Sequence, residues 1–269
     1  ILLFSLILYS FSCVAQKREG QFHNVPFHVY EVPKKDRENI VALTNFLITP
    51  CKNDEEKALA IYAWIADNIK YDVKRLVKGN DTEQTVEETL TKRKGVCTHY
   101  SELFHAMCEL AGLKTIVING YAKGIGYRKK EPFVRANHAW NMIRLNGEWH
   151  MVDMTWGSGF VWYYNYTDEK TVAGALKRKR VYKKLKYFKK NDFGYFLKSP
   201  KELIKTHFPW TPEFQLLNAP INIKTFEKDS IINFLDGVFF DYKSEMDNNA
   251  LLSKRNLIYK TGYYSHDYN

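Results

Sequence analysis

Cysteine is scarce in this sequence, with four copies among 269 residues, and no two of them form a C-x-x-C pair. The ligand spacing of a structural zinc site is therefore missing. The sequence also contains no nucleotide-binding motif and no recognisable set of metal ligands, so we expect no cofactor. No internal repeat is present, and the glycines and prolines are scattered. Together with a hydrophobic content of 45%, these features indicate an ordered globular protein with a packed core.

Long hydrophobic runs are also missing, apart from the one that opens the chain, "ILLFSLILYSFSCVAQ". At about a dozen residues this run is short for a membrane span. It ends in small residues, and this form predicts a signal peptide over residues 1–15 and export to the periplasm, the medium or the cell surface. A lipid anchor on Cys13 is the alternative, although Ser10 stands where a lipoprotein signal normally has leucine. Cleavage after residue 15 leaves an odd number of cysteines, so at least one thiol stays free.

Acidic residues are outnumbered, because 40 Lys and Arg against 30 Asp and Glu give a formal net charge of +10. The excess is concentrated in residues 177–190, "KRKRVYKKLKYFKK", which contain nine basic residues and no acidic one. Such a run is typical of nucleic-acid binding. In an exported protein, however, an acidic polymer or a membrane surface competes, and a solvated loop or helix face is the simplest interpretation. We expect no nucleic acid and retain an anionic partner at 177–190 as a hypothesis.

Helical patterns come first along the chain and strand patterns follow. Apolar spacing predicts a helix in "DRENIVALTNFLI", which ends at Thr49, and another in "NDEEKALAIYAWIADNIKYD", capped by Asn53 or Asp54. A capping box at Thr85 predicts a short helix to about Leu90. The segment "QFHNVPFHVYEVP" looks extended, and the β-branched "KTIVINGYAKG" predicts a strand. This order is typical of an α+β fold with an antiparallel sheet.

The stretch "KGVCTHYSELFHAMCELAG", residues 94–112, holds two cysteines in one predicted helix that Gly112 ends. Cys97 falls in the first turn, on the inward face, where unpaired backbone N–H groups and the helix dipole favour a thiolate. Cys108 lies about 16 Å further along the axis, too far for a disulfide with Cys97. We interpret Cys108 as core filling. From position alone, Cys97 could equally be a small buried hydrophobic residue.

The segment "NHAWNMIRLNGEWHMVDMTWGSG" predicts a β-hairpin with a two-residue turn at Asn146-Gly147. This turn pairs Leu145 with Glu148, and the same register pairs Trp140 with Asp153 and His138 with Thr155.

His138 and Asp153 are then diagonal neighbours on one face, about 7–8 Å apart at the backbone, which an imidazole and a carboxylate can bridge. His150 points to the other face. His99 is a poor base for Cys97, because it lies about 200° around the helix axis. We therefore predict a nucleophilic triad in which Cys97 attacks, His138 takes the thiol proton and Asp153 orients the imidazole. Individually, each residue also has a purely structural explanation.

The three segments "ALAIYAWIADNIKYD", "GVCTHYSELFHAMCELAGLKTIVINGYAKG" and the hairpin resemble, in order, the core of the transglutaminase-like superfamily. Within it, the chain is most similar to the kyphoscoliosis-peptidase-like group and related exported bacterial proteins. The resemblance implies a papain-like transglutaminase core, with the cysteine helix packed on an antiparallel sheet and with Cys97, His138 and Asp153 as the catalytic residues. It divides the chain into a signal peptide (1–15), an N-terminal segment (16–52), the core (53–160) and a C-terminal extension (161–269) that could begin a β domain.

The resemblance implies attack on a carboxamide to form a thioester, with a protein or peptide as substrate. Water as acceptor makes the protein a cysteine peptidase or amidase, which we favour, and an amine makes it a transamidase. A non-catalytic binding protein on the same fold is the third alternative. Two departures favour this alternative: His99 stands where the family usually has a small residue, and a second oxyanion donor is not evident. The segment "HFPWTPEFQLL" resembles a region that follows this core, and we interpret it as an aromatic packing element without assigned chemistry.

Overall fold

The computed structural model describes residues 25–79, 83–125, 127, 131–168 and 180–228. The predicted signal peptide with Cys13, residues 177–179 of the basic run, and the end of the C-terminal extension beyond residue 228 lie outside the described residues.

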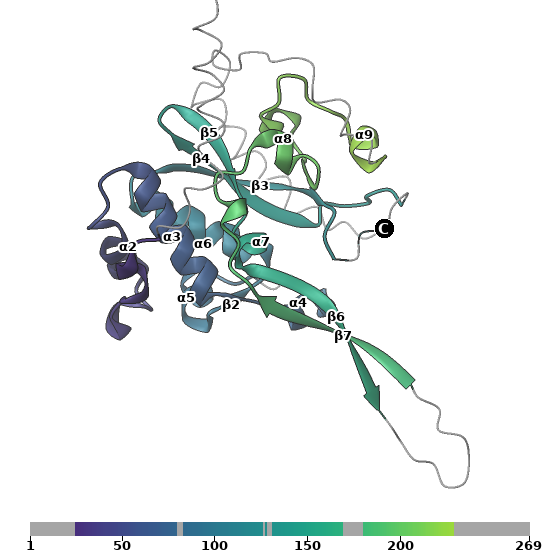
Figure 1. Ribbon diagram of the computed structural model, residues 1–269, viewed down its shortest axis with the longest axis horizontal. Helices are drawn as coiled ribbons and strands as arrows, with labels where there is room; N and C mark the ends of the chain where they lie inside the picture. Colours follow the sequence, from purple (N-terminus) through teal and green to yellow (C-terminus); the bar gives the residue numbers. More distant parts are fainter. Residues whose placement is uncertain (1–24, 80–82, 126, 128–130, 169–179, 229–269) are drawn as a thin grey trace, which may run out of the picture.

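Helices and strands are interspersed along the described chain, and α3 and α6 are the longest of the described helices (Figure 1). The helices are α2 (Ile40–Ile48), α3 (Asp54–Asn68), α4 (Val73–Lys78), α5 (Val86–Lys92), α6 (Cys97–Leu110), α7 (Met154–Ser158), α8 (Pro200–Leu203) and α9 (Ile223–Glu227). The strands are β1 (Lys70–Tyr71), β2 (Lys94–Gly95), β3 (Lys114–Ala122), β4 (His138–Leu145), β5 (Glu148–Val152), β6 (Gly159–Asp168), β7 (Arg180–Lys189) and β8 (His207–Pro209). Single 3-10 turns are η2 (Phe27–Tyr30), η3 (Lys34–Asp36), η4 (Phe193–Tyr195) and η5 (Pro212–Gln215).

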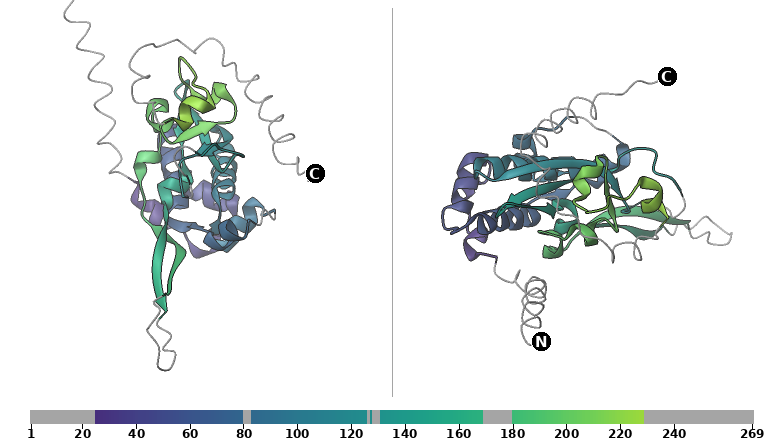
Figure 2. Two further views of the ribbon diagram at one scale, coloured as in Figure 1. Left: turned by 90° about the vertical axis from the view of Figure 1, so that its right-hand side faces the viewer. Right: turned by 90° about the horizontal axis from the view of Figure 1, so that it is seen from above.

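An antiparallel sheet with strand order β5-β4-β3-β8 forms the centre of the molecule. Helix α6 packs against β3 and β4, and α2, α3 and α5 pack around α6, so that one side of the sheet carries a helical layer (Figures 1 and 2). The predicted α+β class is confirmed. Strand β8 lies beyond residue 160, the predicted end of the core, and is nevertheless an edge strand of this sheet. Among the described helices, none has both the length and the hydrophobicity that a membrane span requires.

Three apolar clusters of described residues pack around the sheet, the third of them around Phe208 of β8 and Phe226 of α9. The largest one joins the α2, α3 and α6 side chains to Ile143 and Val152 of the sheet. The second one joins Trp140 and Met142 to Leu203 of α8 and Phe214 of η5. Residues from the C-terminal extension therefore cover part of the sheet that carries the predicted histidine.

The local signals for helix starts and for the hairpin turn are confirmed. Asn53 caps α3, and Thr85 forms the capping box of α5 with Glu88. In the hairpin, Leu145 pairs with Glu148, and Asn146 and Gly147 have φ angles of 51° and 85°. Positive φ at both turn positions is what a type I′ turn requires, and Asn-Gly meets it at low cost.

Two local predictions were wrong. The described part of the "extended" N-terminal segment contains η2, because Pro26 fixes φ near −58° and the Val29 N–H donates to the Pro26 carbonyl. The basic run is neither a loop nor a helix face within the described residues. It forms β7, which pairs along its length with β6 to make a two-stranded ribbon that projects from the body (Figures 1 and 2).

Candidate active site

Cys97 is the first residue of α6, as predicted, and its side chain is half-buried. The turn before it is tight: a Cβ built on Gly95 would lie 2.5 Å from the Cβ of His99, so only glycine fits. His99 closes this turn, since its Nδ1 accepts a hydrogen bond from the Val96 N–H at 3.0 Å. His99 therefore caps the nucleophile helix, and its Nδ1 is already occupied.

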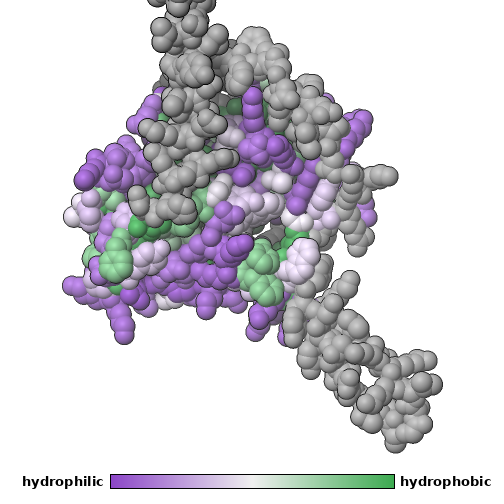
Figure 3. All heavy atoms as spheres, viewed as in Figure 1, coloured by the Kyte–Doolittle hydropathy of each residue, from purple (hydrophilic) through white to green (hydrophobic). Residues whose placement is uncertain are grey.

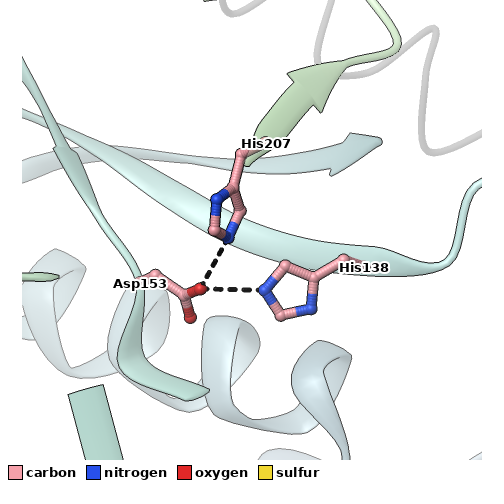
Figure 4. A group of neighbouring side chains, drawn as sticks. All are labelled: His138, Asp153 and His207. Carbon is pink, nitrogen blue, oxygen red and sulfur yellow. Dashed lines mark hydrogen bonds and ion pairs between the residues drawn. The ribbon is translucent and has the colours of Figure 1, made fainter. Parts of the chain in front are cut away.

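His138 and Asp153 meet at the ends of neighbouring strands. His138 begins β4, and Asp153 follows directly after β5 ends at Val152. The Nε2 atom of His138 lies 2.9 Å from Asp153 Oδ2. Figure 4 draws this contact as a dashed line. The predicted contact is present, but the predicted strand register does not continue to Asp153. The reason is local: Asp153 caps α7, and its Oδ1 accepts from the N–H groups of Thr155 and Trp156 at 2.8 and 3.1 Å.

His207 is the site residue that the sequence analysis missed. It begins β8, and its Nε2 lies 2.9 Å from Asp153 Oδ2, the same oxygen that His138 contacts (Figure 4). Its side chain is fully buried. No spacing rule links a residue so far along the chain to Asp153, and only the pairing of β8 with β3 brings it there. The "HFPWTPEFQLL" segment is thus more than an aromatic packing element.

Cys97 is joined to this group through His138. The His138 ring and the backbone N–H of Ala139 both act on the Cys97 thiol in the direction that favours its thiolate form. Because Nε2 of His138 faces Asp153, the ring nitrogen left for Cys97 is Nδ1. Burial raises the pKa of the Cys97 thiol, but the hydrogen bond and the charge of His138 outweigh it, and the pKa is lowered overall.

The pKa values of the other members shift in the directions that an ion pair requires. Burial lowers the pKa of His138, but the charge and hydrogen bond of Asp153 and the contact with Cys97 raise it to about 10. Burial raises the pKa of Asp153, but His138 and then His207 hold it well below its usual range. Burial lowers the pKa of His207; the hydrogen bond and charge of Asp153 oppose this, the charges of His138 and Lys198 add to it, and the pKa is lowered overall. The arrangement can hold a thiolate beside an imidazolium over a buried carboxylate.

Comparison with known proteins identifies the kind of domain that contains Cys97, His138 and Asp153. Residues 41–154 match the transglutaminase-like superfamily. The chain carries a transglutaminase-like domain. It is similar to kyphoscoliosis peptidase of Homo sapiens, with 31% identity over 234 residues that cover 87% of this chain and 31% of that protein. It is also similar to hillarin of Drosophila melanogaster, with 28% identity over 228 residues, 82% of this chain and 26% of that protein. The chain thus spans about a third of the length of these relatives or less.

Among solved structures, one of a candidate cysteine protease from Cytophaga hutchinsonii matches with 24% identity and a TM-score of 0.35, covering 46% of this chain and 39% of that one. The resemblance predicted from the sequence is confirmed by the superfamily match and the curated relatives.

The other two free thiols, those of Cys51 and Cys108, differ from Cys97 in the direction of their pKa shift. Burial raises the pKa of Cys108, which is fully enclosed in the core as predicted. Burial and the charge of Glu56 raise the pKa of Cys51, whose thiol donates to the Leu47 carbonyl at 3.3 Å. Of these three free cysteines, Cys97 is the one with a lowered pKa.

His138, Asp153 and His207 also have the composition of a metal-binding group, with ligand atoms within 4.8 Å of one another. Both Nε2 atoms, however, lie at hydrogen-bonding distance from one carboxylate oxygen, and the three side chains are at most 7% exposed. The two hydrogen bonds to Asp153 explain why these three side chains lie together, and we therefore assign no metal ion to them.

Proposed function

We propose that this chain is a cysteine peptidase or amidase that works through Cys97, His138 and Asp153. The observation that carries the proposal is the 2.9 Å hydrogen bond between His138 Nε2 and Asp153 Oδ2, with the same His138 ring acting on Cys97, the first residue of α6. The thiolate attacks the carbonyl carbon of a carboxamide, and His138 gives its proton to the leaving amine. Water then attacks the thioester, His138 takes the proton of that water, and the carbon–sulfur bond breaks to release the acid and restore the thiolate beside the imidazolium.

The same residues serve a transamidase, in which an amine replaces water in the second step. The choice depends on water access and on an acceptor site rather than on the triad. We prefer hydrolysis because it needs no second binding site. The one oxyanion donor that we propose is the backbone N–H of Cys97, at the start of α6. We further propose that the protein is exported, on the strength of residues 1–15 alone.

The proposal is tested by the pH dependence of iodoacetamide labelling at Cys97, read by peptide mapping with Cys51 and Cys108 as internal references. We expect Cys97 to label rapidly at mildly acidic pH, several units below the ordinary thiol pKa of about 8.5. His138→Ala should return it to ordinary behaviour. Turnover of peptide amides should vanish in Cys97→Ala while thermal unfolding is almost unchanged. Undiminished turnover in Cys97→Ala would refute the enzyme proposal.

A second candidate function, binding of an anionic partner, is favoured by the β6–β7 ribbon. At its base, Phe160 and Trp162 are 48% and 62% exposed, and the Phe160 ring stacks on that of Phe188 across the strands. Lys186 pairs with Trp162, and its Nζ lies 5.4 Å from the centre of the Phe188 ring. Figure 3 shows hydrophobic atoms gathered where the ribbon leaves the body. Exposed aromatic rings beside lysines are better explained by a surface that binds an anionic partner than by a strand that only faces solvent.

A further inference from the structure

The carboxylate of Asp153 is saturated with hydrogen-bond donors. Its Oδ1 accepts from two backbone N–H groups, and its Oδ2 accepts from His138 and His207. An ionised carboxylate is an acceptor only, so each histidine must present a protonated Nε2 to it. Cys97 can take part in proton transfer with His138 Nδ1 only if this arrangement is kept.

His207 meets this requirement as a neutral imidazole. With its proton on Nε2, its Nδ1 is an acceptor. Thr206 Oγ1 lies 2.8 Å from this Nδ1 and 3.3 Å from the Leu203 carbonyl oxygen, so its single hydroxyl proton can be donated to either acceptor. The ring is wedged between aromatic side chains: its centre lies 4.5 Å from that of Trp156 and 5.2 Å from that of Trp140. Packing thus fixes the ring plane, and the acceptor-only Asp153 carboxylate requires the proton on Nε2.

We propose that His207 is a positioning residue, which holds the Asp153 carboxylate ionised and directed at His138 so that His138 can take the Cys97 proton. This inference rests on the proposed function. It also means that the segment beyond the matched residues 41–154 completes the active site, because β8 supplies His207. A buried carboxylate that loses a donor keeps the cost of its desolvation, so it becomes harder to ionise. His138 would then lose its counter-charge, and the Cys97 thiolate would lose its partner.

The titratable and charged groups around Asp153 come from several elements, and each of them can influence the titration of His138 and Cys97. They are Cys97 on α6, His138 on β4, His207 on β8, Tyr62 on α3, Tyr71 on β1, Tyr195 on η4, and Lys198 between η4 and α8. The tyrosines stay neutral, since burial raises their pKa values; the Asp153 charge adds to this for Tyr62 and Tyr195, and the charges of Cys97 and then Asp153 add to it for Tyr71. The histidines and Cys97 therefore dominate the response below pH 9.

The test uses the full chain with His207→Phe, which keeps a ring and removes the donor, and His207→Gln, which keeps an N–H donor. The control is His105→Phe, a buried histidine on the same nucleophile helix that is hydrogen-bonded to Thr115 instead. Two readouts are needed: titration of His138 by NMR of isotope-labelled histidine, assigned with His138→Gln, and the pH profile of Cys97 alkylation. Thermal unfolding is recorded for each variant.

We expect His207→Phe to lower the pKa of His138 and to move the acid limb of Cys97 alkylation upward by about one pH unit, which corresponds to about tenfold slower labelling on that limb. His207→Gln should recover part of both shifts, and His105→Phe should lower the unfolding temperature without moving either. An unchanged His138 titration in His207→Phe would overturn the inference, whatever Cys97 does. If Cys97 of the wild type labels like an ordinary thiol, the proposed function fails instead, and the His138 titration still decides the role of His207.

Discussion

His138 and His207 lie on β4 and β8, the two strands that flank β3, and their ring centres are 5.2 Å apart. Between them in the sheet lies Gly120, which pairs with His138 on one side and with Pro209 on the other. A Cβ at Gly120 would lie 2.2 Å from the Phe208 carbonyl oxygen and 2.6 Å from the Trp140 ring. The absence of a side chain at this position allows both histidines to reach Asp153.

Gly120→Ala should therefore damage both stability and the site. The added methyl group overpacks the contact between β3 and β8 and pushes the two strands apart. Overpacking typically lowers the free energy of unfolding by about 1–3 kcal/mol. The substitution should also raise the pH at which Cys97 is alkylated, because His207 is carried away from Asp153. Chemical denaturation and the alkylation profile measure the two effects.

The matched control is Gly147→Ala at the hairpin turn. A Cβ there meets nothing within 4 Å, but φ is +85°, so the backbone alone is strained. The expected loss is about 1 kcal/mol, with no change in the alkylation of Cys97. If both glycine variants altered Cys97 alike, the effect would belong to general destabilisation and not to the position of β8.

Asp153→Asn should leave the fold in place and remove the function. The asparagine oxygen can still cap α7, but its NH₂ group would face the Nε2–H donors of His138 and His207. To avoid two opposed donors, His138 must move its proton to Nδ1, and it can then no longer accept the Cys97 proton. In a related triad such a change of tautomer lowers kcat by about 10⁴-fold. The measurement is steady-state turnover beside Cys97 alkylation, and a loss of less than tenfold would contradict the assigned role of Asp153.

The same variant tests how the protein responds to acid. The pKa of Asp153 is lower in the folded protein than its unfolded value of about 3.9. Its contribution to stability is therefore complete above about pH 3.9 and is lost as the pH falls through the folded value. We expect the difference in the free energy of unfolding between wild type and Asp153→Asn to be constant from pH 5 to 6 and to shrink below about pH 4. Urea denaturation across this range measures it, and a difference that grows on acidification would be inconsistent with an ionised Asp153.

Sequence reasoning selected Cys97, His138 and Asp153 because the signals that place them are local. Helix periodicity placed Cys97 in the first turn of α6, and the Asn-Gly turn fixed the hairpin register that brings His138 towards Asp153. The register of β5 could not reveal that Asp153 leaves the strand, since that depends on its capping of α7. His207 was beyond reach for a different reason: β8 is a three-residue edge strand, and its partner β3 is far away in the sequence. The pairing of such a short edge strand with a distant strand leaves no local sequence pattern from which it could be predicted.

His99 should prove structural and not catalytic. His99→Ala removes the acceptor for the Val96 N–H at the start of α6, and the lost cap should cost about 1 kcal/mol. His99→Gln should retain the cap, because glutamine at this position can accept the same N–H. Both variants should keep the wild-type pH profile of Cys97 alkylation. A profile that shifted in His99→Ala and not in His99→Gln would show that the cap tunes the thiol, and a shift in both would implicate His99 itself as a base.

The β6–β7 ribbon should bind anions independently of the triad. Lys184 and Lys186 are exposed on β7, and the rings of Phe160 and Trp162 stand beside them on β6. Reversing both charges (Lys184→Glu with Lys186→Glu) should weaken retention on heparin, in a salt-dependent manner, while turnover of a small peptide amide stays unchanged. Lys114→Glu with Lys201→Glu changes the net charge equally at distant positions and should leave retention nearly intact. If the distant pair weakens retention as much as the ribbon pair, binding reflects the overall positive charge, and the ribbon has no specific role as a binding surface.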